Sequence, residues 1–111
     1  MAEYLYLFRG RMQQQSPEAM QAHMQKWMTW MKELTASGNF KGGQPLEDKG
    51  GKVLRGRSKS VTDGPYAEAK DVVGGYLLVE AKSFDHAVEL SRGCPIFDVD
   101  GSVEVRTIMK M

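Results

Sequence analysis

A carboxylate in a tight turn is the first residue that could carry chemistry. Asp63 lies in the segment Thr62-Asp63-Gly64-Pro65, whose residue types are typical of a turn. Its side chain can accept N–H bonds from the residues that follow, which is a purely structural role. Held at the mouth of a cavity and partly removed from water, the same carboxylate can act as a general base or grip a substrate. We therefore take Asp63 as the candidate catalytic residue and keep the structural alternative open.

Three ring side chains share one flank of a predicted helix. His23, Trp27 and Trp30 recur at i, i+4 and i+7, so they point to one side of that helix. A histidine beside two indoles can form a pocket wall on which a flat ligand stacks. The alternative is a set of amphipathic side chains at the border of the core. All three are candidate ligand-binding residues.

Basic residues on two predicted strands could hold an anion. Arg55, Arg57 and Lys59 alternate along one strand face, where they could grip a carboxylate or phosphate, or simply be solvated. Glu104 and Arg106 also share a strand face. If that strand is central in its sheet, the two must pair or serve a cavity. We take Arg106 as a further ligand-binding candidate.

The remaining reactive residue types predict neither a metal site nor a nucleotide cofactor. The single cysteine, Cys94, has no histidine beside it in the sequence and fits a small buried residue better than a nucleophile. His23 and His86 lie too far apart for a recognised metal-ligand spacing. The paired glycines match no phosphate-binding or dinucleotide pattern.

Composition narrows the class of protein. A chain of 111 residues predicts a single domain spanning 1–111. Fifteen basic and fourteen acidic residues give a net charge of +1. This charge does not indicate binding to nucleic acid or to an anionic membrane. No apolar run reaches the roughly 18 residues that cross a bilayer, and no secretory signal is recognisable. We expect a cytoplasmic protein without a membrane partner.

Local signals predict the order of helices and strands. Ser16-Pro17 begins one helix and Ser83 a second, and Gly38 and Gly93 end them. The predicted elements are a strand at 4–9, a helix at 17–37, a strand at 40–46, a hairpin arm at 52–61 with a turn at 62–65, a strand at 72–80, a helix at 83–93 and a strand at 103–109.

This order is the split βαβ arrangement of a ferredoxin-like α+β domain with a hairpin insertion. The first strand is expected to be buried on both faces at its centre. The glycine pairs at 42–43 and 74–75 predict bulges or close backbone approaches. The two helices cover one sheet face and leave the other without a cover. A second copy of the chain is the simplest cover, so we predict a homodimer with a barrel-like interior.

The helix at 17–37 carries a wide apolar stripe. Its members recur at spacings of four and three, which is typical of a buried face. We expect the methionines to fill the core. The width exceeds what one sheet face needs, which indicates that the helix also faces a cavity or a second subunit. The stripe consists of Met20, Met24, Trp27, Met31 and Leu34, with Met28, His23 and Trp30 at its margins.

Longer motifs resemble a known family. The segment 61–70, VTDGPYAEAK, followed by VGGY at 73–76, resembles the signature of the DGPF group of YCII-related proteins. The ending GSVEVR at 101–106 is similar to that group as well. So is the helix pattern WxxWMxxL at 27–34 with the glycines that follow it. The resemblance covers nearly the whole chain.

The resemblance implies a dimeric α+β barrel that binds or converts a small molecule, in a group often associated with extracytoplasmic-function sigma factors. Tyr66 stands where phenylalanine is usual; it keeps the ring, adds a hydroxyl and is a ligand-binding candidate. Other YCII-related proteins pair a helix histidine with the turn aspartate. Trp27 fills that histidine's place here and His23 lies one turn earlier, so the pair with Asp63 is not intact.

Two classes of function follow. We predict a homodimer that binds an anionic or aromatic small molecule without a cofactor, with Asp63 as the acid/base residue if it is an enzyme. The alternative is a non-catalytic ligand-binding or regulatory dimer, linked to sigma-factor signalling, in which Asp63 only forms the turn.

Overall fold

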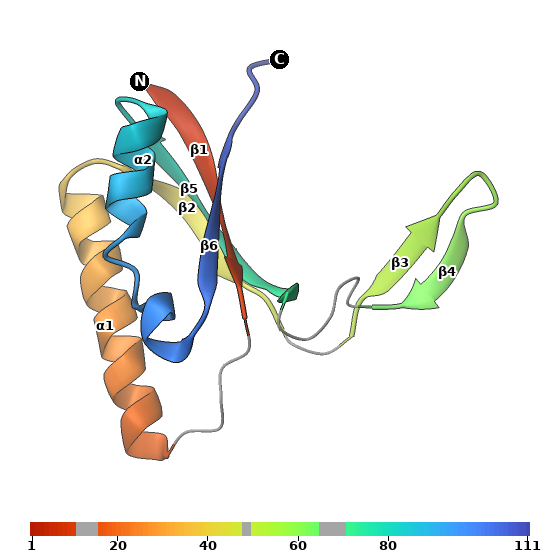
Figure 1. Cartoon of the computed structure of the whole chain (residues 1–111), viewed down its shortest axis with the longest axis horizontal. Coiled ribbons are helices and arrows are strands. Elements are labelled where there is room, and N and C mark those ends of the chain that lie inside the picture. Colours follow the sequence, from red (N-terminus) through yellow and green to blue (C-terminus); the bar gives the residue numbers. More distant parts are fainter. Residues whose placement is uncertain (11–15, 48–49, 65–70) are drawn as a thin grey trace.

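A four-stranded antiparallel sheet forms the body of the molecule (Figure 1). The computed structural model describes residues 1–10, 16–47, 50–64 and 71–111. The strands of this sheet are β1 (Ala2–Arg9), β2 (Phe40–Pro45), β5 (Val73–Ala81) and β6 (Ser102–Thr107). Their order is β2-β5-β1-β6, so β5 and β1 are central and β2 and β6 lie at the edges.

Two helices pack on the same side of this sheet (Figure 1). They are α1 (Pro17–Ala36) and α2 (Phe84–Ser91), and a short 3-10 helix, η2 (Pro95–Val99), follows α2. The order of elements and the antiparallel strand order confirm the predicted ferredoxin-like α+β fold.

Each helix begins at the serine that the sequence indicates. The Ser16 hydroxyl accepts the Ala19 N–H at 3.1 Å, with Pro17 in the first helical position. The Ser83 hydroxyl accepts the His86 N–H, also at 3.1 Å. These bonds satisfy backbone donors that a helix start otherwise leaves without partners.

A second, two-stranded sheet projects from the body on the side away from the helices (Figure 1). Strands β3 (Lys52–Arg55) and β4 (Ser60–Asp63) pair antiparallel, and we call residues 52–63 the arm. The predicted hairpin insertion is therefore confirmed, but the stretch 52–61, expected to form one arm of it, contains the chain reversal itself. The chain reverses between the two strands, where Gly56 and Lys59 adopt φ values of 66° and 56°, a conformation that closes a tight turn. Asp63 consequently ends β4, and Pro65 of the expected turn lies outside the described residues.

The core lies between the sheet and the helices. Alternate residues of the two central strands point into it, together with Trp30 and Leu34 of α1 and Ala87 of α2. The strand residues are Tyr4, Tyr6 and Phe8 of β1 and Leu77, Val79 and Ala81 of β5.

Helix α1 faces the sheet with the C-terminal part of the predicted stripe, Trp27, Met31 and Leu34, but its N-terminal part is shifted toward the His23 and Trp30 margin. His23, Trp30 and Leu34 are buried, and Trp27 is half-buried. The expectation that methionines fill the core was wrong for the N-terminal part of the stripe, because indole rings bury more apolar area and pack edge to face on the ring of Phe8. The methionines on the exposed side are Met20, Met24 and Met28.

The other face of the sheet, which we call the open face, is covered by neither α1 nor α2. It carries Leu5 and Leu7 of β1 and Tyr76 and Leu78 of β5, all half-buried. Strand β1 is therefore fully buried on one face only, contrary to the expectation of burial on both.

The glycine pairs act as predicted. Phe8 lies opposite Gly75 and Arg9 opposite Val73, so Gly74 is an extra residue in the ladder and forms a bulge. Gly43 lets β2 approach β5 closely, because a Cβ there would lie less than 3.0 Å from the carbonyl oxygen of Tyr76.

We expect Gly43→Ala to lower the free energy of unfolding by about 3 kcal/mol, since a methyl group there forces two backbones apart. Gly42→Ala is a matched control, because Gly42 has a similar φ, 150° against 158°, but open space around its Cβ position. The control should cost about 1 kcal/mol through backbone strain alone. Urea unfolding followed by tryptophan fluorescence measures both, and equal losses would contradict the steric explanation.

Candidate functional site

The open face combines an apolar centre with charged margins. Leu5 lies opposite Leu78 and Leu7 opposite Tyr76, so four apolar side chains form one compact patch. The edge strands supply polar neighbours to this patch. These are Gln44 of β2, opposite Tyr76, and Glu104 and Arg106 of β6, opposite Leu7 and Leu5.

Arg9 is the best-anchored cation on this face. Its Nη2 and Nε donate to the Glu104 carboxylate at 3.1 and 3.3 Å, and its Nη1 donates to the Asp71 carbonyl at 2.7 Å. These bonds engage three of the five guanidinium N–H groups. Within the described part of the chain, two N–H groups are thus left for an anion, and the side chain is already held in place.

The other charged groups of the face are paired less tightly. Lys41 of β2 lies 3.4 Å from Glu80, and Arg106 lies 3.5 Å from Glu104. Arg106 and Glu104 do share a strand face, as expected. The strand is an edge strand, however, and the Arg106 side chain is 65% exposed. The central position assumed for this strand was wrong, because β1 and β5 occupy the middle of the sheet.

Asp63 lies at the base of the arm, exposed to solvent. Its carboxylate is paired with the Lys52 ammonium at 2.5 Å, and its side chain is 86% exposed. The neighbouring Gly64 N–H donates to the Gly51 carbonyl at 3.1 Å and closes the base of the hairpin. In the single protomer the carboxylate is therefore well hydrated, and its visible role is an ion pair across the first residues of β3 and β4.

The three ring residues of α1 lie on the helix side of the sheet. The Trp27 indole N–H donates to Nε2 of His23 at 2.9 Å. The Trp30 indole N–H donates to the Leu90 carbonyl at 3.2 Å, which joins α1 to α2. Both indoles pack edge to face on Phe8. The trio thus behaves as part of the core, on the opposite sheet face from Arg106.

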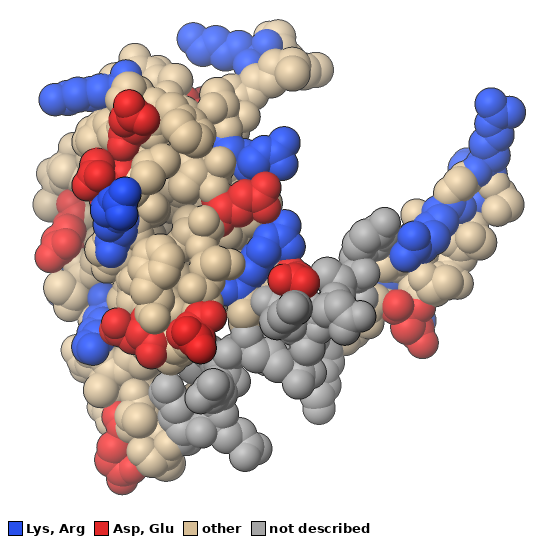
Figure 2. All heavy atoms as spheres, in the orientation of Figure 1, with Lys and Arg blue, Asp and Glu red and all other residues tan. Residues whose placement is uncertain are grey.

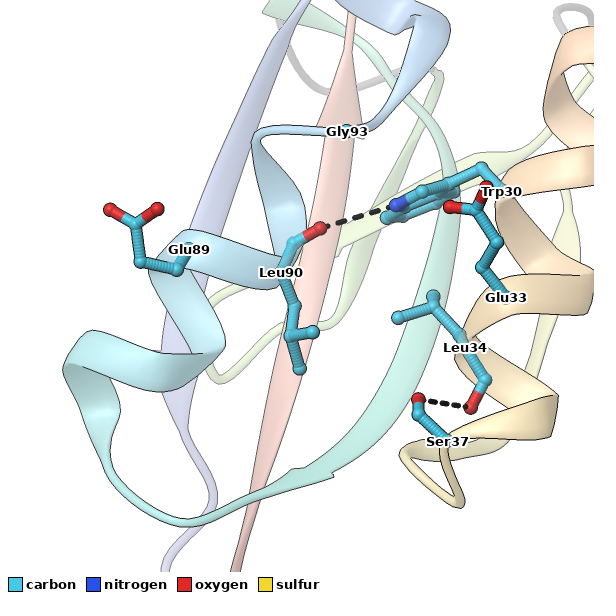
Figure 3. Close-up of a pocket in the computed structure, with 7 residues that line it drawn as sticks. All are labelled: Trp30, Glu33, Leu34, Ser37, Glu89, Leu90 and Gly93. Atoms are coloured by element: carbon cyan, nitrogen blue, oxygen red, sulfur yellow. Dashed lines mark hydrogen bonds between the residues drawn. The ribbon is translucent and has the colours of Figure 1, made fainter.

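A shallow groove of about 350 Å³ runs between α1 and α2 on the outer surface (Figure 3). Trp30 reaches it only with an edge, since the residue is 4% exposed. Of its two carboxylates, Glu89 is already paired with Arg92 at 3.0 Å. The lining residues are Trp30, Glu33, Leu34, Ser37, Glu89, Leu90 and Gly93.

The structure does not bring the candidate residues into one site. His23, Trp27 and Trp30 belong to α1 on the helix side of the sheet, Arg106 lies on the open face, and Asp63 lies on the arm. Tyr66 falls outside the described residues, so its place relative to the others stays a prediction.

The buried thiol of Cys94 is a poor nucleophile. Burial, with a smaller contribution from Asp98, raises its pKa to about 12 despite a stabilising backbone hydrogen bond. Burial also raises the pKa of Tyr6, whose hydroxyl donates to the Ala87 carbonyl. Among the residues that the structure describes, no three His, Cys, Asp or Glu side chains gather in a way that could hold a metal ion. None of the described helices is long and apolar enough to span a bilayer.

Sequence reasoning missed Arg9, Lys41 and Tyr76 as site residues. A signal existed in β1, where Leu5, Leu7 and Arg9 alternate with the aromatic residues and so mark a second face. For Lys41 and Tyr76 the signal is only the pairing of distant strands, which no local pattern contains.

The sequence matches the YCII-related domain over residues 3–111. The chain belongs to the YCII-related family. This confirms the family resemblance, while membership of the DGPF group stays a prediction.

Structural comparison shows the same fold for this YCII-related chain. It is similar to 5-chloro-2-hydroxyhydroquinone dehydrochlorinase of Burkholderia phenoliruptrix AC1100 in complex with 2,5-dihydroxybenzoquinone, with a TM-score of 0.53 and 18% identity. The match covers 98% of this chain and 95% of that one. No curated protein is significantly similar to the YCII-related chain in sequence.

The raised pKa of Cys94 predicts a loss of stability in alkaline solution. The thiol ionises near pH 9 when unfolded and near 12 when folded, so the unfolded state loses its proton first. The free energy of unfolding should then fall between these pH values, at up to about 1.4 kcal/mol per pH unit from this group. Urea titrations from pH 8 to about 10.5 should show a shallower fall for Cys94→Ala. Equal slopes for the variant and the wild type would contradict this cause.

Proposed function

We propose that this YCII-related protein is a homodimer that binds a small molecule between two open faces. The observation that carries the proposal is the open face itself, where an apolar patch of Leu5, Leu7, Tyr76 and Leu78 adjoins the anchored guanidinium of Arg9. Such an apolar patch on a sheet is unfavourable in water. A two-fold pairing of identical faces covers it in both copies at once.

The lining of this face favours a flat molecule with an anionic group. Tyr76 and the leucines offer an apolar floor, on which a ring can lie. Arg9 offers two further N–H groups to a carboxylate, phenolate or phosphate. The structural neighbour of the same fold is in complex with 2,5-dihydroxybenzoquinone, a small planar ring, which supports the size and shape of the proposed ligand.

Binding without catalysis is the second candidate function, and the environment of Asp63 favours it. A general base needs a carboxylate partly removed from water, whereas Asp63 is 86% exposed and paired with Lys52. Catalysis by Asp63 therefore requires that dimerisation bury this residue. In the non-catalytic version the protein is a cytoplasmic ligand-binding regulator, with sigma-factor signalling as its setting and no nucleic-acid partner, in line with its near-neutral charge.

We expect the wild type to sediment as a dimer at micromolar concentration and Leu78→Glu as a folded monomer. The new carboxylate would be buried without a partner in the dimer but hydrated in the protomer. Met28→Glu is the matched control, because Met28 is 55% exposed on α1, and it should remain a dimer. A monomeric wild type, or a Leu78→Glu variant that still dimerises through the same face, would refute the proposed interface.

A thermal-shift screen of aromatic acids should yield a ligand that raises the melting temperature. At about a hundred times its Kd, such a ligand adds roughly 2.7 kcal/mol of apparent stability. Arg9→Gln should raise the Kd at least about tenfold through the lost charged hydrogen bonds. Arg92→Gln removes an ion-paired arginine on the helix side and should leave the Kd unchanged. If both variants bind as the wild type does, the open face is not the ligand site.

Asp63→Asn separates binding from catalysis. If Asp63 is catalytic, the variant binds the screened ligand but turns over none of it. If Asp63 only pairs with Lys52, the variant binds the ligand as the wild type does, matches it in whatever turnover it shows, and loses about 0–1 kcal/mol of stability, as expected for an exposed ion pair. Mass spectrometry of the ligand after incubation, together with isothermal titration, distinguishes the two results.

A further inference from the structure

The arm has no core of its own. Leu54 and Val61 lie directly opposite each other in the β3–β4 ladder and are 62% and 58% exposed. A two-stranded hairpin in water is at best marginally stable without something to pack against. The arm also makes the protomer extended: its radius of gyration is 15.6 Å, against about 13 Å for a compact chain of this length.

The arm differs in charge from the rest of the chain. Residues 50–64 contain four basic residues and one acidic residue, a net +3. Since the whole chain carries +1, the remainder carries −2. Figure 2 shows basic side chains along much of the arm, which stands clear of the body with a notch between them. In a second copy, the part of the chain outside its own arm therefore carries a net charge opposite in sign to that of the arm.

The open face alone is small for a stable interface. Four strands about 4.8 Å apart and roughly 24 Å long have a projected area of about 450 Å². Specific interfaces bury about 800 Å² on each partner. Side chains make the accessible area of the face larger than this projection, but a dimer of open faces still needs further contacts. The arm projects from the same side of the sheet and can supply them (Figure 1).

We propose that each arm reaches across the homodimer and packs on the second copy. Leu54 and Val61 supply the apolar contact, and Arg57 and Lys59 face acidic side chains of the partner's body. This inference rests on the proposed homodimer and goes beyond it, because it assigns the arm a function. By two-fold symmetry both arms make the same contact, so each substitution counts twice in the dimer.

The first test replaces the apolar pair. The double variant Leu54→Thr/Val61→Thr keeps residues that favour strands and should raise the dimer Kd at least about tenfold in sedimentation equilibrium. Met24→Gln is the matched control, since Met24 is a similarly exposed apolar residue of α1, at 53%, and its Kd should stay unchanged. An unchanged Kd in the double variant, or an equal weakening by Met24→Gln, overturns the proposal.

The second test concerns charge. The wild-type dimer should weaken as salt rises, because salt screens the attraction between arm and body. Arg57→Glu/Lys59→Glu should weaken the dimer at low salt and remove most of this salt dependence. If the variants dimerise normally but lose binding to a DNA duplex that the wild type binds, the arm's partner is nucleic acid and the proposal is wrong.

A variant that lacks the arm tests the proposal independently of whether the substituted arms fold correctly. Because the Gly64 N–H bonds to the Gly51 carbonyl at 3.1 Å, residues 52–63 can be removed with Gly51 joined to Gly64. This variant should keep the circular dichroism of the body and dimerise at least about tenfold more weakly than the wild type. A wild type that is a monomer overturns the homodimer as well, whereas a deletion variant that dimerises like the wild type overturns the role of the arm alone.

Discussion

The central sheet contributes one face to the core and leaves the other as the open face. The alternation of side chains along its two central strands makes this possible. Successive residues of a strand point to opposite faces, so Tyr6 enters the core while Leu5 and Leu7 lie on the open face. A shift of the register by one residue would exchange the two sets. The bulge at Gly74 interrupts this alternation near the start of β5, between the pairs Phe8–Gly75 and Arg9–Val73.

Hydrogen bonds from the polar groups of aromatic side chains in β1 and α1 to backbone carbonyls of α2 hold the helices on the sheet. The Tyr6 hydroxyl donates to the Ala87 carbonyl, and the Trp30 indole donates to the Leu90 carbonyl. Trp30 and Tyr6 stack with ring centres 6.3 Å apart. A Cβ at Gly93 would lie only 3.1 Å from the Trp30 ring. One cluster therefore ties β1, α1 and α2 together, which explains why tyrosine and tryptophan rather than phenylalanine occupy these positions.

Features with local causes were predictable from the sequence. The serine caps and the glycine bulges depend on hydrogen bonds or sterics within a few residues, and both are confirmed. The side of α1 that faces the sheet was not predictable, because two apolar stripes lie one residue apart and only packing against Phe8 selects between them. The edge position of β6 and the exposure of Arg106 depend on strand order, which no local pattern contains.

The positions of His23 and Asp63 limit the chemistry open to a single protomer. Nε2 of His23 accepts the Trp27 indole N–H on the helix side of the sheet, while Asp63 pairs with Lys52 on the arm, which projects from the other side. A proton cannot pass between groups separated by a packed sheet, so these two residues cannot act as an acid/base pair within one chain. What the open face retains is an anchored guanidinium beside an apolar patch. Such a combination can hold an anionic ring without a proton relay. In the proposed dimer, any catalysis would draw on the ligand's own reactivity or on groups that the second copy brings to the same space.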